Sequence, residues 1–597
     1  MTEEKGADVK VIDPAELSQA MASIAERSQR IVADFVARQA AEPGQQNLDP
    51  LNIGNAFMEM TAKMMSDPAK LVEANLTLWN DYLSLWQNTA RRLFGEHSEP
   101  VAKPEPADRR FKDEMWEENE VFDFIKQSYL LSARYMHGLV HGVEGLDEHT
   151  AQKVDFYTRQ FVDAMAPSNF VLTNPEVLRT TIESGGENLV KGLNNLLSDL
   201  ERGKGKLSIK MTDYDAFKVG DNIAVTPGKV VFQNDLMQLL QYNPTTETVA
   251  EKPLLVVPPW INKFYILDLR PKNSFIKWAV DQGHTVFVIS WVNPDEHLAA
   301  KDFTDYMKEG PLAALQAIEL ATGQKEVNAV GYCLGGTLTV CTLAYMAAKG
   351  LSGIASATLL TTMTDFAEPG ELGVFIDEEQ LAALEARMSE HGFLDGRDMA
   401  MTFNMLRAND LIWSFVVNNY LLGKDPFPFD LLYWNSDSTR MPAAMHSFYL
   451  RKMYQQNRLV QAGGIQLDGT DIDLSKIKTP IYMLSAREDH IAPWKSTFSL
   501  TQHSGGPVKF VLAASGHIAG VVNPPAANKY CYWVNNKKVK SPDTWLNGAT
   551  QMEGSWWPDW HAWATKGCKQ IAARVPGDNK LAVLGEGPGS YVKERAV

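Results

Sequence analysis

Cysteine is scarce in this sequence of 597 residues. Only Cys333, Cys341, Cys531 and Cys568 are present, at wide and irregular spacing. This spacing excludes a disulfide framework and gives no set of zinc ligands. Such a chain suits a reducing cytosol, where a free thiol can act as a nucleophile.

Positive charge and long apolar runs are also lacking. Lys and Arg number 57 against 73 Asp and Glu, which leaves a net charge of −16 and argues against a nucleic-acid-binding protein. No apolar run is long enough to span a membrane, and the N-terminal stretch MTEEKGADVK lacks the basic-then-apolar order of a signal peptide. We therefore expect a cytoplasmic protein without a transmembrane segment. A polyanionic substrate would need locally clustered cations.

The first third of the chain is helical in character. Because the whole chain is too long for one hydrophobic core, several folding units are expected. We predict a helical region over residues 1–97, a proline-rich linker over 98–107 and a mainly helical domain over 108–214. In the first region, one helix stripe contains Leu76, Trp79, Leu83, Trp86, Ala90 and Leu93. This stripe either packs on its own domain or contacts a partner or a hydrophobic product surface.

From about residue 215 the pattern changes to short apolar runs that alternate with helical stretches. Runs such as PLLVV, TVFVIS and EVNAV predict the strands of an α/β fold, a mostly parallel sheet with helices on both faces. This catalytic domain comprises residues 215–364 and 451–597. The aromatic-rich insertion at 365–450 is most simply a cap over the active site.

The stretch GYCLGG marks the candidate nucleophile. It places glycine two residues before and two residues after Cys333, between a predicted strand and a predicted helix. This arrangement is typical of the sharp turn that presents the nucleophile in α/β-hydrolase-type sheets. At a helix N-terminus, unpaired N–H groups and the helix dipole favour a thiolate. Cys341 lies in the middle of the helix and is expected to be a small buried residue.

The partners of the nucleophile should follow in the order acid, histidine. Asp489 comes just after the strand PIYMLS, and His517 lies in the loop after VKFVLA. Both positions are beyond the carboxyl ends of strands, where this architecture gathers its chemistry. We predict that Cys333, Asp489 and His517 form the catalytic site. Glu488 is expected to point elsewhere, and His490 falls on the acid loop.

A tetrahedral intermediate needs N–H donors for its oxyanion. One should be the backbone N–H of Leu334, which directly follows the nucleophile. The other should come from the loop PPWINKFYILDL, whose two prolines have no N–H to donate. Ile261 is our choice within that loop.

A pair of histidines, His137 and His141, lies on one face of a predicted helix, four residues apart. Metal ligands can have this spacing. Because the sequence offers no third ligand nearby, we expect a solvated helix surface there and no metal site.

Taken together, these motifs resemble those of class I polyhydroxyalkanoate synthases. The stretches that carry the resemblance include GYCLGG, PPWINKFYILDLRP, AREDHIAP, ASGHIAG, NIAVTPGKVV, DRRFKDEMW, APSNF, GSWWPDW and EGPGSYV. The resemblance implies an acyltransferase that polymerises (R)-3-hydroxyacyl-CoA into a polyester and releases CoA. It assigns the catalytic roles to Cys333, Asp489 and His517. Tyr332 resembles the forms that use short monomers, which implies 3-hydroxybutyryl-CoA and hence poly(3-hydroxybutyrate).

The resemblance also implies partners. We expect a homodimer with cap residues at or near the contact, and association with the surface of polyester granules and with granule-associated proteins. No cofactor is expected, since CoA is a leaving group of the substrate. A thiol suits the reaction because exchange of one thioester for another keeps the growing chain activated.

Two other functions were weighed. A thioesterase or a polyhydroxyalkanoate depolymerase would use the same Cys-His-Asp set, and a granule coat protein would use the apolar stripe. The motifs and the long N-terminal region favour synthesis. The sequence leaves open whether His517 or Asp489 acts on the substrate hydroxyl, and whether elongation uses one thiol or two.

Overall fold

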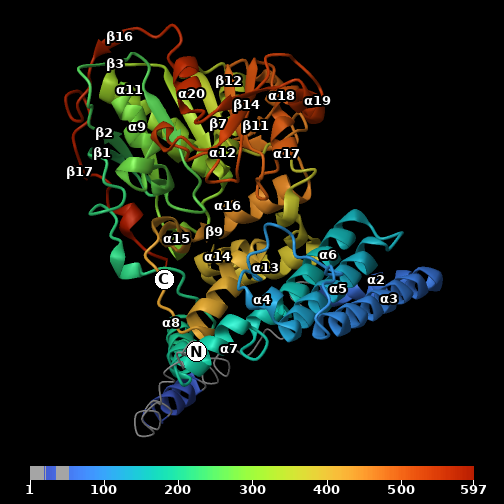
Figure 1. Cartoon of the computed structure of the whole chain (residues 1–597). Coiled ribbons are helices and arrows are strands. Elements are labelled where there is room, and N and C mark those ends of the chain that lie inside the picture. Colours follow the sequence, from blue (N-terminus) through green and yellow to red (C-terminus); the bar gives the residue numbers. More distant parts are fainter. Residues whose placement is uncertain (1–18, 20–21, 32, 35–52, 597) are drawn as a thin grey trace. The chain divides into compact units, whose positions relative to one another are not determined.

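The computed structural model describes residues 19, 22–31, 33–34 and 53–596, so much of the predicted region 1–97 lies outside the described residues. The chain divides into two compact units, which we call unit 1 and unit 2. Unit 1 contains the residues up to Asp213 together with Thr402–Pro428, and unit 2 contains the rest (Figure 1). The middle of the segment predicted as a cap thus belongs to unit 1.

Unit 1 is helical. Its helices are α2 (Ile53–Met65), α3 (Pro68–Leu93), α4 (Met115–Glu118), α5 (Glu120–His141), α6 (Glu148–Ala164), α7 (Pro175–Glu183) and α8 (Glu187–Arg202). Local sequence fixes several starts: Asp67, Asn119, Asp147 and Asn174 each accept a backbone N–H of the first turn that follows. Proline follows directly at the start of α3 and α7, where its missing N–H costs nothing.

The apolar stripe of α3 is exposed. The exposed fractions of Leu76, Trp79, Leu83, Trp86 and Leu93 lie between 43% and 68%. The helix packs on its own unit through a second apolar face, which contains Leu78, Tyr82 and the fully buried Leu85 and contacts Leu131 of α5. The prediction that α3 packs on its own domain through this stripe therefore fails for most of its residues, although Trp86 contacts Phe124 of α5 with ring centroids 5.1 Å apart.

Unit 2 is built on an eleven-stranded sheet with the order β15-β14-β13-β12-β7-β6-β4-β5-β2-β1-β17. Its central strands, from β13 to β5, are parallel, and antiparallel strands extend both edges. The strands are β1 (Gly228–Gln233), β2 (Met237–Tyr242), β4 (Leu254–Val257), β5 (Val286–Trp291), β6 (Val327–Tyr332), β7 (Ile354–Leu360), β12 (Ile481–Ala486), β13 (Val508–Ala513), β14 (Cys531–Val534), β15 (Thr550–Glu553) and β17 (Gly585–Glu586). The predicted fold, a mostly parallel sheet, is confirmed.

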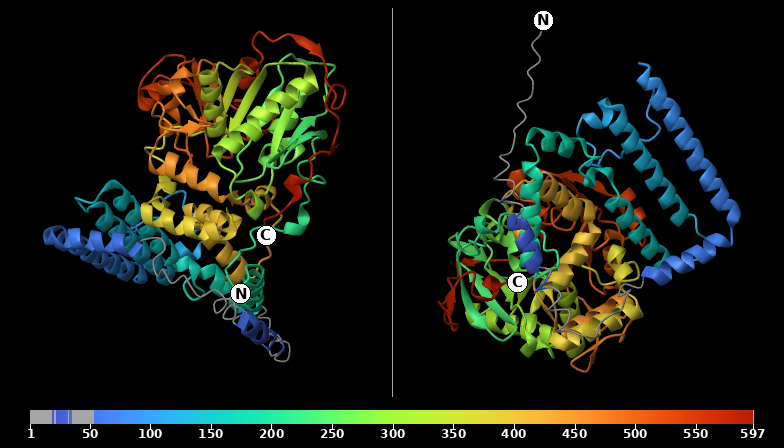
Figure 2. Two further views of the ribbon diagram at one scale, coloured as in Figure 1. Left: turned by 180° about the vertical axis from the view of Figure 1, so that it is seen from behind. Right: turned by 90° about the horizontal axis from the view of Figure 1, so that it is seen from below.

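Helices cover both faces of this sheet (Figures 1 and 2). They include α9 (Phe275–Asp281), α10 (Phe303–Met307), α11 (Ala313–Thr322), α12 (Leu334–Lys349), α17 (Trp494–Phe498), α18 (Leu500–His503), α19 (Pro542–Asn547) and α20 (Trp557–Ala564). Successive residues of a strand contribute to opposite cores: Met483 packs in one apolar cluster, whereas Tyr482 and Leu484 pack in the other. Strands buried on both faces explain the continuous apolar runs in the sequence.

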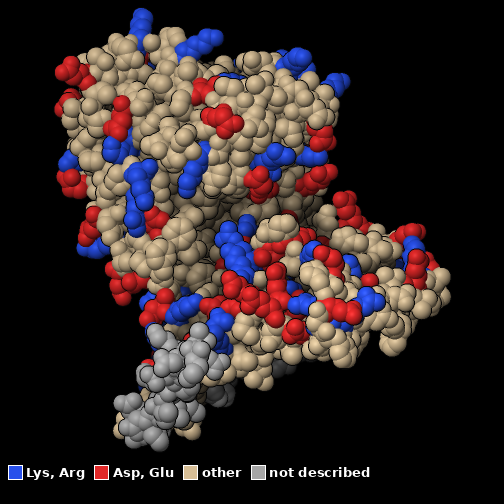
Figure 3. Space-filling view, in the orientation of Figure 1, with Lys and Arg blue, Asp and Glu red and all other residues tan. Residues whose placement is uncertain are grey.

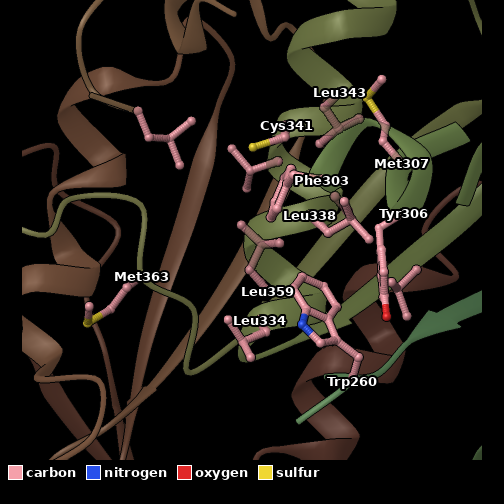
Figure 4. Packing of buried hydrophobic residues seen from close by; sticks show 14 of the residues in the cluster. Trp260, Phe303, Tyr306, Met307, Leu334, Leu338, Cys341, Leu343, Leu359 and Met363 are labelled. Atoms are coloured by element: carbon pink, nitrogen blue, oxygen red, sulfur yellow. The ribbon is translucent and has the colours of Figure 1, made fainter. Parts of the chain in front are cut away.

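The first of these cores surrounds α12. Figure 4 shows Leu334, Leu338 and Cys341 along this helix, with Trp260 and Phe303 beside them. Every residue from Leu334 to Met346 is buried. The helix that follows the candidate nucleophile is therefore held by the protein core along most of its length.

The insertion between β7 and β12 contributes further helices to unit 2. They are α13 (Glu378–His391), α14 (Gly396–Leu406, whose last residues fall in unit 1), α15 (Asp430–Ser436), α16 (Ala443–Phe448) and the π-helical segment η10 (Tyr449–Gln455). On the face shown in Figure 3, acidic and basic side chains over unit 2 are scattered and mixed. Among the described residues, no helix has the length and apolar character needed to cross a membrane.

Candidate active site

Cys333 occupies a strained turn between β6 and α12. Its backbone has φ 52° and ψ −119°, a conformation that residues other than glycine rarely adopt. A Cβ atom on Gly335 would lie 2.0 Å from the carbonyl oxygen of Val257, and one on Gly331 would lie 2.5 Å from Gly336 Cα. The glycines of GYCLGG are therefore required, because the backbone approaches β4 and the first turn of α12 too closely for side chains.

Asp489 and His517 come together at the ends of adjacent strands. Asp489 follows β12, and its Oδ2 lies 2.7 Å from Nδ1 of His517, which follows β13. The other carboxylate oxygen of Asp489 accepts the backbone N–H groups of Ile491 and Ala492, both at 2.9 Å. The carboxylate is fully buried and the imidazole is 10% exposed. This acid is therefore fixed in position by three hydrogen bonds.

The histidine also reaches the cysteine. The side chain of His517 interacts electrostatically with both Asp489 and Cys333. Burial acts to lower the pKa of His517, but its interactions with Asp489 and Cys333 raise that pKa well above its usual range. The site thus favours a protonated imidazole. All three predicted residues are brought into one cluster.

Aromatic side chains surround this cluster. The ring of Tyr332 stacks on His517 with centroids 5.7 Å apart, and its hydroxyl donates to the His517 carbonyl oxygen at 3.3 Å. Tyr449 and Tyr454 of η10 are both buried enough to raise their pKa, and the charge of Cys333 raises it further. Phe366 packs on Tyr454 with centroids 4.9 Å apart. Sequence reasoning did not identify Phe366, Tyr449 and Tyr454, because they belong to no recognisable motif.

The two candidate oxyanion donors lie near each other in the fold. Leu334 is the first residue of α12, so its N–H has no acceptor within the helix. Ile261 follows β4 in the loop that starts at Pro258, and it packs against the same apolar core as Leu334. Trp260, the neighbour of Ile261, lies beside Leu334 in Figure 4. Their roles as oxyanion donors stay predictions.

Comparison with known proteins identifies the family of this chain. The family described as "Poly-beta-hydroxybutyrate polymerase (PhaC) N-terminus" matches residues 107–279, and the alpha/beta hydrolase fold matches residues 257–524. The poly(3-hydroxyalkanoate) polymerase subunit PhaC of Rhizobium meliloti is 50% identical over 98% of this chain and 96% of its own length. The chain belongs to the poly(3-hydroxyalkanoate) polymerase family. The resemblance inferred from the motifs is confirmed.

A second relative carries the same polymerase name. The poly(3-hydroxyalkanoate) polymerase of Methylorubrum extorquens is 53% identical over 89% of this chain and 88% of its own length. Among solved structures, a hydrolase from Pseudomonas aeruginosa PA01 matches 50% of this chain and 95% of its own, with 14% identity and a TM-score of 0.31.

The remaining cysteine and acid candidates of this polymerase-family chain lie outside the cluster. Cys341 is fully buried in α12, and burial raises the pKa of its thiol to about 12, whereas Cys333 is only half-buried. Glu488 is exposed although its neighbour Asp489 is buried. Cys341 is thus too buried to meet a substrate, and Glu488 faces the solvent.

The histidine pair of α5 does have a third potential ligand. Asp155 of α6 lies with one carboxylate oxygen, Oδ1, 3.5 Å from His141 Nδ1 and 3.9 Å from His137 Nδ1. The expectation that no third ligand is near was therefore wrong. The sequence signal was the H-x-x-x-H spacing alone, because the aspartate comes from the next helix of this polymerase-family chain.

Proposed function

We propose that this chain polymerises (R)-3-hydroxyacyl-CoA, most simply (R)-3-hydroxybutyryl-CoA, and holds the growing polyester as a thioester on Cys333. Membership of the poly(3-hydroxyalkanoate) polymerase family supports the polymerase activity. The observation that supports the thioester is the strained turn that presents Cys333 to a histidine backed by a buried carboxylate. The enzyme is thus an acyltransferase, and its cycle uses no cofactor.

In the acylation step, the Cys333 thiolate attacks the thioester carbonyl carbon of the substrate. The oxyanion that forms accepts N–H donors, for which Leu334 and Ile261 are the candidates. When the tetrahedral intermediate collapses, the bond to the CoA sulfur breaks and the protonated His517 supplies the proton to the departing thiolate. The raised pKa of His517 favours this role, because the imidazole holds its proton at neutral pH until a thiolate leaves.

In the elongation step, the neutral His517 takes the proton of a 3-hydroxyl group as its oxygen attacks a thioester carbonyl. An ester bond forms, a carbon–sulfur bond breaks and a thiolate is released. Asp489 orients the imidazole and stabilises its charged form, which is the role its hydrogen bond to Nδ1 supports. Direct action of Asp489 on the hydroxyl is the less favoured alternative, because both oxygens of that carboxylate already accept hydrogen bonds.

The thiol explains why polymerisation can proceed. Exchange of the CoA thioester for a Cys333 thioester loses little free energy, so the acyl group stays activated for the next hydroxyl. On a serine it would become an oxygen ester, and the next transfer would lose most of its drive. The aromatic walls formed by Phe366, Tyr449 and Tyr454 exclude water from this intermediate and favour a short acyl side chain.

Association with the product surface is part of the proposal. The exposed stripe of α3, with Leu76, Trp79 and Trp86, offers an apolar face that a polyester granule in the cytoplasm would cover. Deletion of the segment through residue 95 should release the enzyme from isolated granules more than it slows CoA release. A homodimer is proposed with it, and sedimentation showing a fully active monomer would contradict the dimer.

The decisive experiment supplies (R)-3-hydroxybutyryl-CoA and follows both CoA and the acyl product. Release of CoA with an insoluble polyester supports synthesis, whereas CoA with soluble hydroxy acid supports a thioesterase or depolymerase. Mass spectrometry after brief exposure to substrate should find acyl units on Cys333. Acylation that persists in Cys333→Ala would overturn the mechanism while leaving the family assignment intact.

A further inference from the structure

We propose that unit 1 carries a binding site for a zinc-class transition-metal ion, formed by His137 and His141 of α5 and Asp155 of α6. The three residues offer one ligand atom each, and these atoms lie within 4.8 Å of one another. All three belong to unit 1, so the site does not depend on the catalytic cluster of unit 2.

The spacing of the ligand atoms fits a shared ion better than it fits hydrogen bonds. Asp155 Oδ1 lies 3.5 Å from His141 Nδ1 and 3.9 Å from His137 Nδ1. Both separations exceed the range of an N–H···O hydrogen bond, about 2.7–3.2 Å. Tetrahedral zinc with bonds of about 2.0–2.1 Å keeps its ligand atoms about 3.3 Å apart. Small side-chain rotations would therefore place an ion between the three atoms.

The unsatisfied carboxylate oxygen is a second sign of a missing partner. Asp155 Oδ1 is inaccessible to solvent and has no hydrogen-bond partner among the described residues. A buried carboxylate oxygen without a donor is costly, and a cation is the partner that the two neighbouring imidazoles allow. The side chains of His141 and Asp155 are 67% and 33% exposed, so an ion can reach the site from solvent.

The C-terminal end of α5 favours positive charge at this place. His141 is the last residue of α5, where the helix dipole is negative and stabilises a cation. Binding through His141 Nδ1 requires this atom to give up its 2.9 Å hydrogen bond to the His137 carbonyl oxygen. That cost makes the affinity moderate.

Ligand chemistry selects the class of ion. Two imidazoles and one carboxylate suit zinc, cobalt, nickel or copper, whereas magnesium and calcium prefer oxygen ligands. Three protein ligands leave a fourth position for water, so the site resembles an open zinc site more than a closed structural one. A bound ion would connect α5 to α6, which the chain joins only through the turn at residues 142–147.

The test uses the full chain without a histidine tag and in a Cys333→Ala background, so that the thiol–imidazole pair cannot hold metal. Zn²⁺ is titrated by calorimetry, and Co²⁺ serves as a spectroscopic probe. One Zn²⁺ should bind per chain, and Asp155→Asn and His141→Ala should each weaken binding at least about tenfold. Both variants should abolish the intense visible bands of low-coordinate Co²⁺. The exposed His97 of the same unit supplies the control, and His97→Ala should bind as the parent does.

Thermal unfolding gives an independent measurement. An ion that binds only the folded state raises the melting temperature in proportion to its saturation, and Asp155→Asn should remove this shift. Absence of Zn²⁺ binding overturns the proposal. Unchanged affinity in Asp155→Asn also overturns it, since it would reduce the site to a two-histidine surface chelate. These outcomes leave the polymerase function untouched.

Discussion

Replacement of Asp489 by asparagine is the sharpest test of the proposed catalytic cluster of Cys333, Asp489 and His517. The carboxylate is fully buried, its Oδ2 lies 2.7 Å from His517 Nδ1, and its Oδ1 accepts two backbone N–H groups. Those two N–H groups require an acceptor, so the asparagine must turn its oxygen toward them and its NH₂ group toward the imidazole. The NH₂ group is a donor, which forces the proton of neutral His517 onto Nε2. The imidazole then cannot accept a proton on the side that faces Cys333.

The magnitude follows from this loss of general-base and general-acid function. We expect the rate of polymerisation by Asp489→Asn to fall by about 10²–10⁴-fold, equivalent to about 3–5 kcal/mol in the activation barrier. The charge of Asp489 is a main reason that the pKa of His517 is raised, so its removal lowers that pKa. The rate of acylation by Asp489→Asn should then vary with pH in the neutral range, because the lowered pKa of His517 moves toward that range, whereas the parent enzyme should show little change.

The assay combines continuous CoA release with mass spectrometry of the acyl-enzyme at several pH values. Glu488→Gln is the matched control, because Glu488 is the adjacent acid and is exposed. Its rate should stay within about twofold of the parent, since a solvated side chain contributes little to general-base catalysis. If Asp489→Asn keeps both the parent rate and the parent pH profile, the reasoning about the tautomer of His517 is refuted.

Three further changes have expected outcomes. Cys333→Ser should keep the fold but make no polymer from (R)-3-hydroxybutyryl-CoA, and any polyester in a turbidity assay would contradict the thioester argument. Gly335→Ala should lower the free energy of unfolding by about 1–3 kcal/mol in urea titrations, because its Cβ meets Val257 O at 2.0 Å. Leu85→Ala should cost about 2–5 kcal/mol in the same assay, whereas the exposed Leu76→Ala should change stability by less than about 0.5 kcal/mol. If Leu85→Ala and Leu76→Ala lower the stability equally, the assignment of Leu85 to the buried face of α3 is contradicted.

The central strands could be predicted because their signals are local. The runs PLLVV, TVFVIS and EVNAV fall on β4, β5 and β6 with shifts of one or two residues, and VKFVLA coincides with β13. Strands buried on both faces read as short apolar runs, and the turns between them are marked by glycine and proline. The position of Cys333 was equally predictable, since two flanking glycines are needed at a strand-to-helix turn of this tightness.

Features that depend on contacts between distant segments could not be predicted in this way. Helix α3 has apolar residues on two faces, and only the packing of α5 determines that Leu85 is buried and Trp79 exposed. Tyr454 approaches Cys333 from a segment more than one hundred residues later that carries no motif. Asp155 completes the histidine cluster from a neighbouring helix. In each case the sequence gives the residue types but not the neighbour that assigns their role.

Strand order explains how Cys333, Asp489 and His517 can come together at all. The order β6-β7-β12-β13 places Cys333 and Asp489 at the ends of strands two apart, about 10 Å at a strand spacing of about 4.8 Å. His517 follows β13, one strand farther from the sulfur, so its loop must turn back. Ser515 has φ 75°, and its carbonyl oxygen accepts the Glu488 N–H at 3.0 Å, which ties this loop to the acid loop.

Because of this hydrogen bond, the position of His517 is determined by the neighbouring acid loop and by the strands that carry both loops. With Nδ1 held by Asp489, the imidazole spans the remaining gap across the end of β7 toward Cys333. The backbone of Cys333 is held as well, because the Cys333 N–H donates to the Leu360 carbonyl oxygen of β7 at 2.9 Å. A strained residue of this kind costs about 1–3 kcal/mol and persists only where its surroundings hold it. Each of the three groups is therefore positioned by a neighbouring strand before any substrate binds.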